Sequence, residues 1–303
     1  MFLLPVFLAL FFAGACSARE SSQSAETVIP GEVQLPPGPA WPALALLKTG
    51  ANPIWFELGP GGPSLIESPA VAALTPYTPW PHARFITGLQ MWEGFLVMAV
   101  NRDGFLILGT TAEPTELVLY RAADSALWDL YTTESFFIWE DRPLVLLYRS
   151  DFFSELSAPP FASRIFTLSK SNPAPIPASI GAFENLAAPW EAEVVRRGPG
   201  GFWYIRVKEK GQAQNSTAYF RTEDLAREGQ RISVEEWRNS DPRGTDSISA
   251  ISDSRPFSLP AMPEGFTYNN VTLFGDVLVA SWEEQADAVI GAAGFMVMAL
   301  NAN

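Results

Sequence analysis

The sequence predicts an all-β chain whose body is a β-propeller of about six or seven blades. Apolar runs of about 5–8 residues alternate with turn signals from Trp41 onward, which is the pattern of successive strands. The chain holds 26 Pro and 22 Gly, residues that interrupt long helices and favour turns. Several of the runs also pair through short polar links, which predicts antiparallel hairpins.

Four hairpins stand out from Trp41 to the end of the chain. The first has an Asp103-Gly104 link, where glycine tolerates the positive φ that a tight turn requires. The paired runs are 94–100 with 104–108, 136–139 with 144–148, 202–207 with 218–221, and 277–282 with 294–300. Outer strands are expected over 116–120 and 164–168. Ser233 and Glu236 form a capping box that predicts one short helix before Asp241-Pro242.

The spacing of these hairpins suggests a radial repeat. They start near residues 94, 135, 201 and 276, at intervals of 41, 66 and 75 residues. The first interval suits a propeller blade of roughly 40–45 residues, and the longer ones require inserts or degenerate blades, one of them near 248–251. Radial closure protects sheet edges from other chains. The alternative is a β-sandwich or two stacked β domains, because the same hairpins would serve those folds.

The amino terminus has the pattern of an export signal. Residues 2–12 are apolar throughout, too short a run for a helix spanning a bilayer, and Ala13-Gly14-Ala15 precede Cys16. This segment resembles the lipobox of bacterial lipoproteins, in which cleavage before the cysteine exposes it to acylation. The resemblance implies a signal peptide over 1–15 and lipid attachment at Cys16. Residues 16–40, rich in Ser, Glu, Gly and Pro, form the expected flexible tether before the body at 41–303.

Two features depart from that pattern. Ala13 stands where lipoboxes usually have a branched residue, and no Lys or Arg precedes the apolar run. Ordinary cleavage after Ala13-Gly14-Ala15 is one alternative, and a buried segment with an incidental cysteine is another. The position of the chain's single cysteine, directly after the small residues, favours lipidation. The predicted location is therefore the bacterial cell envelope, lipid-anchored and facing the periplasm or the surface.

Charge and residue counts exclude several classes of site. The formal net charge of −13 argues against a nucleic-acid partner, since such a partner requires a basic surface. Arg196-Arg197, and Lys208 with Lys210, are the densest basic groups and are interpreted as solvated strand edges. One cysteine and one histidine, His82, cannot build a metal site of several His or Cys ligands. No catalytic residue, metal or cofactor is predicted.

Tryptophan and acidic residues adjoin repeatedly. The pairs are Trp92-Glu93, Trp139-Glu140-Asp141, Trp190-Glu191 and Trp282-Glu283-Glu284. Aromatic faces beside carboxylates are typical of sugar binding, and two facing carboxylates can cleave glycosides. The plainer interpretation is that each tryptophan ends an inner strand and packs between sheets, while the acid starts a solvated turn.

Two stretches, 262–300 and 86–111, resemble segments of uncharacterised spirochaete lipoproteins with a β-propeller-like body. The resemblance implies export and a β-rich body, and it implies no functional residue. The expected function is a non-enzymatic envelope lipoprotein that binds a protein partner or serves as a scaffold, with the membrane engaged through the lipid. A glycan-binding or glycoside-cleaving protein using the Trp–acid pairs is the alternative, and a purely structural protein is a third.

Overall fold

The computed structural model describes residues 39–59, 61–69, 84–101, 104–113, 115–122, 132–148, 164–180, 190–209, 217–240, 257–286 and 289–300. The predicted signal peptide, Cys16 and all but the last two residues of the predicted tether lie outside this part of the chain, as do His82 and residues 248–251. Trp41, near the start of the described part, is buried in the body.

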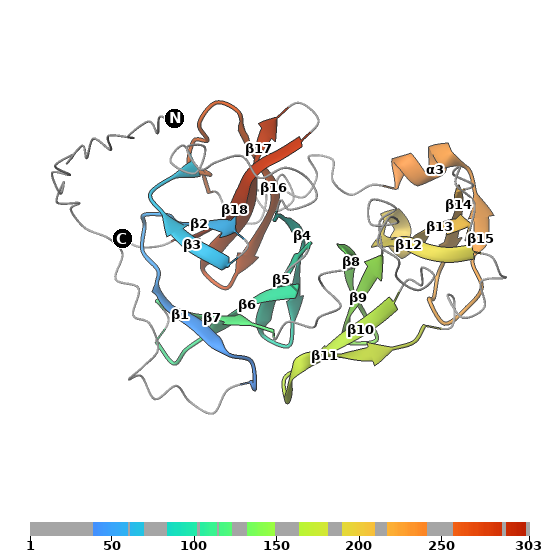
Figure 1. The fold of residues 1–303 in the computed structure, drawn as a ribbon, viewed down its shortest axis with the longest axis horizontal. Helices are drawn as coiled ribbons and strands as arrows, with labels where there is room; N and C mark the ends of the chain where they lie inside the picture. The colour runs from blue at the N-terminus through green and yellow to red at the C-terminus, as the bar shows by residue number, and fades with distance from the viewer. Residues whose placement is uncertain are drawn as a thin grey trace, which may run out of the picture.

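Four antiparallel sheets, called blades I to IV here, form the body (Figure 1). Blade I has the strand order β1 (Ala43–Lys48), β7 (Glu116–Arg121), β6 (Gly104–Thr110), β5 (Phe95–Val100), β4 (Ile86–Trp92). Blade II has the order β11 (Asn172–Ala178), β10 (Arg164–Ser169), β9 (Arg142–Tyr148), β8 (Thr132–Trp139). Blade III has the order β12 (Trp190–Arg197), β13 (Trp203–Glu209), β14 (Thr217–Thr222), β15 (Gln230–Ile232). Blade IV has the order β16 (Phe266–Phe274), β17 (Val277–Ala286), β18 (Val289–Ala299), β2 (Ile54–Gly59), β3 (Gly62–Ile66).

Each blade is a meander that starts with its inner strand, and the arrangement is propeller-like. The inner strands are β4, β8, β12 and β16, and the following strands pair with them in chain order. All four predicted hairpins exist, as β5–β6, β8–β9, β13–β14 and β17–β18. The all-β class is therefore confirmed, with a propeller-like ordering of the sheets.

The predicted count of six or seven blades is not confirmed, because the described residues form four. Each predicted hairpin lies in a separate blade, so the long intervals between hairpins separate neighbouring blades and contain no further described sheet. The strands nearest the amino terminus also form no blade of their own. Strand β1 completes blade I, and β2 with β3 completes blade IV.

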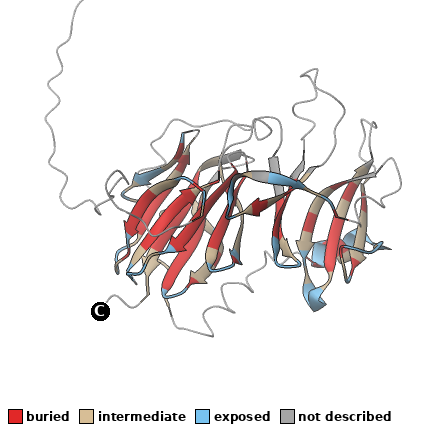
Figure 2. Cartoon of the chain, turned by 90° about the horizontal axis from the view of Figure 1, so that it is seen from below, coloured by how far each residue is buried: buried red, intermediate tan, exposed pale blue. Residues whose placement is uncertain are grey.

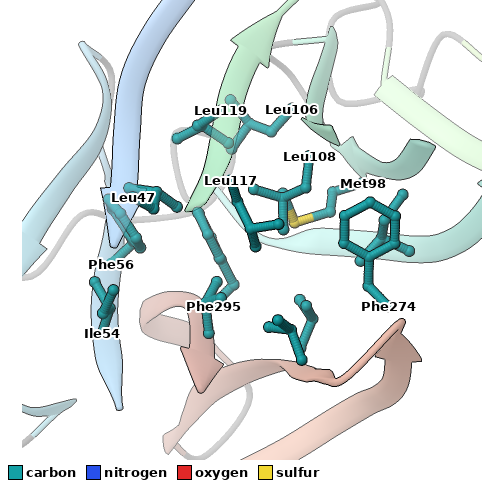
Figure 3. Packing of buried hydrophobic residues seen from close by; sticks show 14 of the residues in the cluster. Leu47, Ile54, Phe56, Met98, Leu106, Leu108, Leu117, Leu119, Phe274 and Phe295 are labelled. Carbon is teal, nitrogen blue, oxygen red and sulfur yellow. The ribbon is translucent and has the colours of Figure 1, made fainter. Parts of the chain in front are cut away.

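The blades pack face to face in the order IV, I, II, III, because three buried clusters join the successive pairs of blades. Figure 2 shows the buried strands of the body. Strand β5 explains why the apolar runs are continuous. Leu96, Met98 and Val100 enter the core shared with blade IV, while Val97 and Ala99 enter the core shared with blade II. Because successive side chains point to opposite faces, a strand between two cores is apolar at every position. Figure 3 shows the core between blades I and IV.

The two outer faces of this row of blades are covered differently. Phe257, Leu259 and Met262 pack on the outer face of blade IV. Helix α3 (Val234–Asn239) lies against blade III, where its Trp237 ring contacts Tyr219 on β14 at 5.3 Å between centroids. Ser233 caps this helix by accepting a hydrogen bond from the Glu236 N–H at 3.1 Å, which confirms the predicted start of the helix. The Glu236 carboxylate accepts a hydrogen bond from Arg221 at 2.8 Å.

No described helix has the length and apolar character that crossing a membrane would require.

A candidate binding cavity between the inner strands

A cavity of about 800 Å³ lies where the inner strands of all four blades converge. Strand β4 contributes Thr87 to Gln90, β8 contributes Ser135 to Trp139, and β12 contributes Val194 to Arg197. The lining is completed by Asn270 of β16, Trp203 and Arg206 of β13, Glu140, and Trp237 of α3. This volume is within the range of small-molecule sites, roughly 300–1,000 Å³.

The topology explains why these residues face the cavity. Each inner strand is the edge strand of its sheet, so one of its edges pairs within the blade and the other faces the common axis. Blades II and III meet there directly: the Ser135 hydroxyl accepts a hydrogen bond of 2.8 Å from the Val195 N–H. The rings of Phe137 and Trp203 contact each other at 5.4 Å. Strands β8 and β12 therefore lie side by side along the cavity.

Three arginines bring positive charge to the lining. The Arg196 guanidinium lies 3.9 Å from the centroid of the Trp237 ring and donates hydrogen bonds to the Trp237 carbonyl and, at 2.8 Å, to the Ser240 hydroxyl. The Arg197 guanidinium lies 4.7 Å from the centroid of the Trp203 ring. Arg206 differs from both, because its Nε donates to a Glu193 carboxylate oxygen at 2.7 Å.

The turn between β8 and β9 lies beside this lining and has an unusual backbone. Glu140 and Asp141 both have positive φ, 48° and 57°, as a two-residue type I′ turn requires, although neither is glycine. Arg142 lies 5.3 Å from the centroid of the Trp139 ring and 3.4 Å from the Glu140 carboxylate. The Asp141 carbonyl accepts a hydrogen bond from Trp92 Nε1 at 3.1 Å, which joins the turn to blade I.

The tryptophans of the three Trp–acid pairs whose side chains are described, Trp92, Trp139 and Trp282, do not line one cavity. Trp92 is 7% exposed and packs in the core between blades I and II, while its neighbour Glu93 pairs with Lys170 at 2.5 Å. Trp282 is 1% exposed in the cluster on the outer face of blade IV. Among the described residues, Trp139 is the one tryptophan of these pairs that lines the cavity, and Glu140 is the one carboxylate that does.

The interpretation that each tryptophan ends an inner strand and each acid starts a solvated turn holds for the pairs at Trp92 and Trp139 and fails for the pair at Trp282. Trp92 and Trp139 end inner strands, and exposed acids follow them in tight turns. Trp282 instead lies within β17, and Glu284 of the same strand accepts a hydrogen bond from the Ala292 N–H at 3.1 Å. The side chains of Trp190 and Glu191 lie outside the described residues.

Sequence reasoning missed the arginines of the cavity. Arg196 and Arg197 were expected to be solvated on a strand edge, and β12 is indeed an edge strand, but that edge faces the cavity. Two features of the sequence could have indicated this position. Arg196-Arg197 end a segment that begins with alternating apolar and acidic residues, and the next strand begins with Trp203, whose ring can accept a guanidinium.

Cys16 and His82 lie outside the described residues, so the structure assigns neither a place. In the described part of the chain, no group of three His, Cys, Asp or Glu side chains is placed to hold a metal ion.

Comparison with known proteins yields a family but no activity. No curated protein and no solved structure matches the chain. One family model matches over residues 47–254 and 243–302, which together span almost the whole described body. The chain therefore belongs to DUF8086, a family of unknown function.

Proposed function

We propose that this chain is a lipid-anchored binding protein of the bacterial cell envelope, and that its ligand enters the cavity between the inner strands. The observation that carries the proposal is the lining of that cavity. All four blades contribute to it, and arginine and tryptophan side chains lie beside amide and hydroxyl groups. Such a mixture of aromatic surface and a few oriented polar groups is typical of small-molecule sites.

The character of the lining favours binding over hydrolysis of a glycoside. Two carboxylates on either side of the scissile bond are needed for that reaction. Within the described lining Glu140 is the single carboxylate, and it pairs with Arg142. The guanidinium groups, held by tryptophan rings, are suited instead to recognition.

The anchor part of the proposal rests on Cys16 and the lipobox-like residues before it. The test is to compare the full chain with Cys16→Ser in the native host. The unchanged chain should partition with membranes and carry fatty acid on its first residue by mass spectrometry. A mature terminus without fatty acid, or equal membrane partition of Cys16→Ser, contradicts lipid anchoring.

The binding part is tested by photo-crosslinking in intact cells. A photoreactive amino acid replaces Leu89, which lines the cavity, or Ile176, which is exposed on β11 in blade II. The Leu89 position should acquire a defined mass adduct that the Ile176 position lacks. An adduct of protein mass would reveal the envelope partner, whereas the same labelling at both positions would contradict a ligand in the cavity.

A further inference from the structure

The cavity differs in charge from the molecule as a whole. The chain carries a net charge of −13, whereas the charged lining residues are Arg196, Arg197, Arg206 and Glu140. A concave site of one sign, enclosed by low-dielectric walls, concentrates ions of the opposite sign. In an otherwise acidic protein, this local excess of positive charge indicates an anionic ligand.

Arg197 is the arginine of this group that is best placed to receive an anion. Arg206 already pairs with Glu193, and Arg196 donates to the Trp237 carbonyl and the Ser240 hydroxyl on the α3 side. Arg197 packs on Trp203 and makes no ion pair with another described residue. A guanidinium stacked on an indole keeps its N–H groups at its rim, where they can bind a carboxylate or a phosphate in a bidentate manner.

The indole on which the exposed Arg197 side chain packs is in place before any ligand binds. Trp203 is 4% exposed and is itself fixed by the Phe137 ring, so the platform under the guanidinium is rigid. The backbone adds a second donor. Because the Val195 N–H points away from β13 toward Ser135, the alternation of an antiparallel ladder directs the Arg197 N–H to the same edge.

The rest of the lining indicates the body of the ligand. Thr87, Gln90 and Asn270 line the sides formed by blades I and IV. The Thr87 hydroxyl donates to the Ala99 carbonyl at 3.3 Å and the Asn270 amide donates to the Ser281 hydroxyl at 3.1 Å, and both side chains keep oxygens that can accept further hydrogen bonds. Amide and hydroxyl side chains both donate and accept hydrogen bonds, so they match a hydroxyl-rich molecule better than an apolar one. A cavity of about 800 Å³ is within the size range of sites that bind small molecules.

We infer that the ligand is a small, hydroxyl-rich anion, such as a sugar acid or a sugar phosphate, and that Arg197 binds its carboxylate or phosphate group. This inference rests on the proposed function, because it names the ligand class of the same cavity. It assigns Arg197 a recognition role that the family match does not supply.

The experiment is calorimetric titration of the purified full chain with four probes. These are a glucuronate-containing disaccharide, the methyl ester of the same disaccharide, a disaccharide phosphate and tetraglutamate. The acid, the phosphate or both should bind at least roughly tenfold more tightly than the ester, because the ester keeps the sugar and removes the charge. The two anionic arms distinguish a carboxylate ligand from a phosphate ligand.

Variants assign the effect to one residue. Arg197→Gln should weaken binding of the preferred anion by roughly 10- to 100-fold and remove the preference over the ester. Arg197→Lys should retain part of the affinity, since it keeps the charge and loses the planar fork. Arg231→Gln is the matched control, because Arg231 is exposed on β15 of the same blade and does not line the cavity. Thermal unfolding of each variant confirms that the fold is retained.

Three results overturn the inference: equal affinity for acid and ester, unchanged binding by Arg197→Gln, or equally tight binding of tetraglutamate. The crosslinking experiment distinguishes a wrong ligand class from a cavity that binds no ligand. If Leu89 is labelled specifically while no anion binds, the cavity binds a ligand of another class. If Leu89 is not labelled and no probe binds, the proposed function itself fails.

Discussion

Arg196 and Arg197 are adjacent in the chain, yet their side chains stack on tryptophans from different elements. Successive side chains of a strand point to opposite faces, so Arg196 reaches Trp237 of α3 and Arg197 reaches Trp203 on β13. At the end of this inner strand, Arg196 therefore contacts helix α3 on one face of the blade, and Arg197 places its guanidinium on the other face. A substitution of Arg196 is therefore expected to affect the part of the cavity beside Trp237, and a substitution of Arg197 the part beside Trp203.

Gly294 is the described glycine where an added Cβ would approach other atoms most closely. A Cβ added there would overlap the Phe56 carbonyl and lie 2.6 Å from the Trp282 ring, and both groups are held in blade IV. Gly294→Ala should therefore destabilise the protein by about 3 kcal/mol, the upper end of typical overpacking costs. Urea unfolding followed by tryptophan fluorescence measures the change.

The control for this prediction is Gly50→Ala. No atom lies within 4 Å of a Cβ added at Gly50, and its φ is not positive. The expected change is below about 1 kcal/mol. Similar midpoints for the two variants would show that blade IV can relax around the added methyl group.

Tyr268 makes stability sensitive to high pH. Burial raises its pKa to about 12, and its hydroxyl donates a hydrogen bond to the Pro260 carbonyl at 3.0 Å. Between pH 10 and 12 the unfolded chain loses the phenol proton while the folded chain keeps it, so stability should fall as pH rises through this window. The contribution is fully present below about pH 10.

Tyr268→Phe tests this titration directly. The variant should be less stable than the unchanged protein at pH 8, because it lacks the hydrogen bond to Pro260. The difference in unfolding free energy between the two proteins should narrow by pH 11.5, since the unchanged protein loses stability as Tyr268 titrates and phenylalanine has no proton to lose. Burial also raises the pKa of Tyr120, but that residue is present in both proteins and cancels in the comparison. A gap that stays constant from pH 8 to pH 11.5 would contradict the assignment.

At the level of elements, local patterns predicted strands and hairpins well. Runs such as 94–100 and 277–282 are apolar because both faces of β5 and β17 are buried. Consecutive apolar residues therefore indicate these strands directly. The helix at 234–239 was equally predictable, since one hydroxyl and one following N–H define its start. These features depend on neighbours in the chain, which a single sequence contains.

The turns and the cavity were less predictable. Glu140 and Asp141 adopt positive φ without a glycine, so the expected four-residue link became a two-residue turn, with Arg142 and Pro143 in β9. The cavity depends on which strand of each sheet faces the axis. That information comes from contacts between blades, such as the one between Ser135 and Val195, and no local pattern encodes it.

Strand β11 shows how the composition of an outer strand can protect its edge. Among the described strands it pairs only with β10, and its sequence has prolines at positions 173, 175 and 177. Proline has no N–H, so a strand with proline at alternate positions is a poor template for pairing with a second chain. This edge of blade II therefore resists intermolecular pairing by composition, in contrast to the inner edges, which face the cavity.

At the scale of the whole molecule, the N-terminal strands join blades whose other strands come from later in the chain. Strand β2 pairs with β18, with Phe56 opposite Phe295, while β1 pairs with β7 in blade I. The Phe56 and Phe295 rings stack at 4.6 Å in the core between blades I and IV. A fixed blade period of about 40–45 residues does not anticipate long-range pairing of this kind, because β1–β3 complete existing sheets and form no separate described blade.

Because the N-terminal strands pair into blades I and IV, we expect a substitution in their shared core to reduce protection from hydrogen exchange in both blades. Phe56→Ala removes a buried ring at the junction and should destabilise the protein by about 3–5 kcal/mol. Hydrogen exchange should accelerate in β18 and also in β5, because both line the core that Phe56 enters. Phe137→Ala is the matched control: it lies in the core between blades II and III and should accelerate exchange in β8 and β13 while leaving β18 protected. If Phe56→Ala accelerates exchange only within residues 54–66, the N-terminal strands are an appendage to blade IV, and the two ends of the chain do not stabilise one shared core.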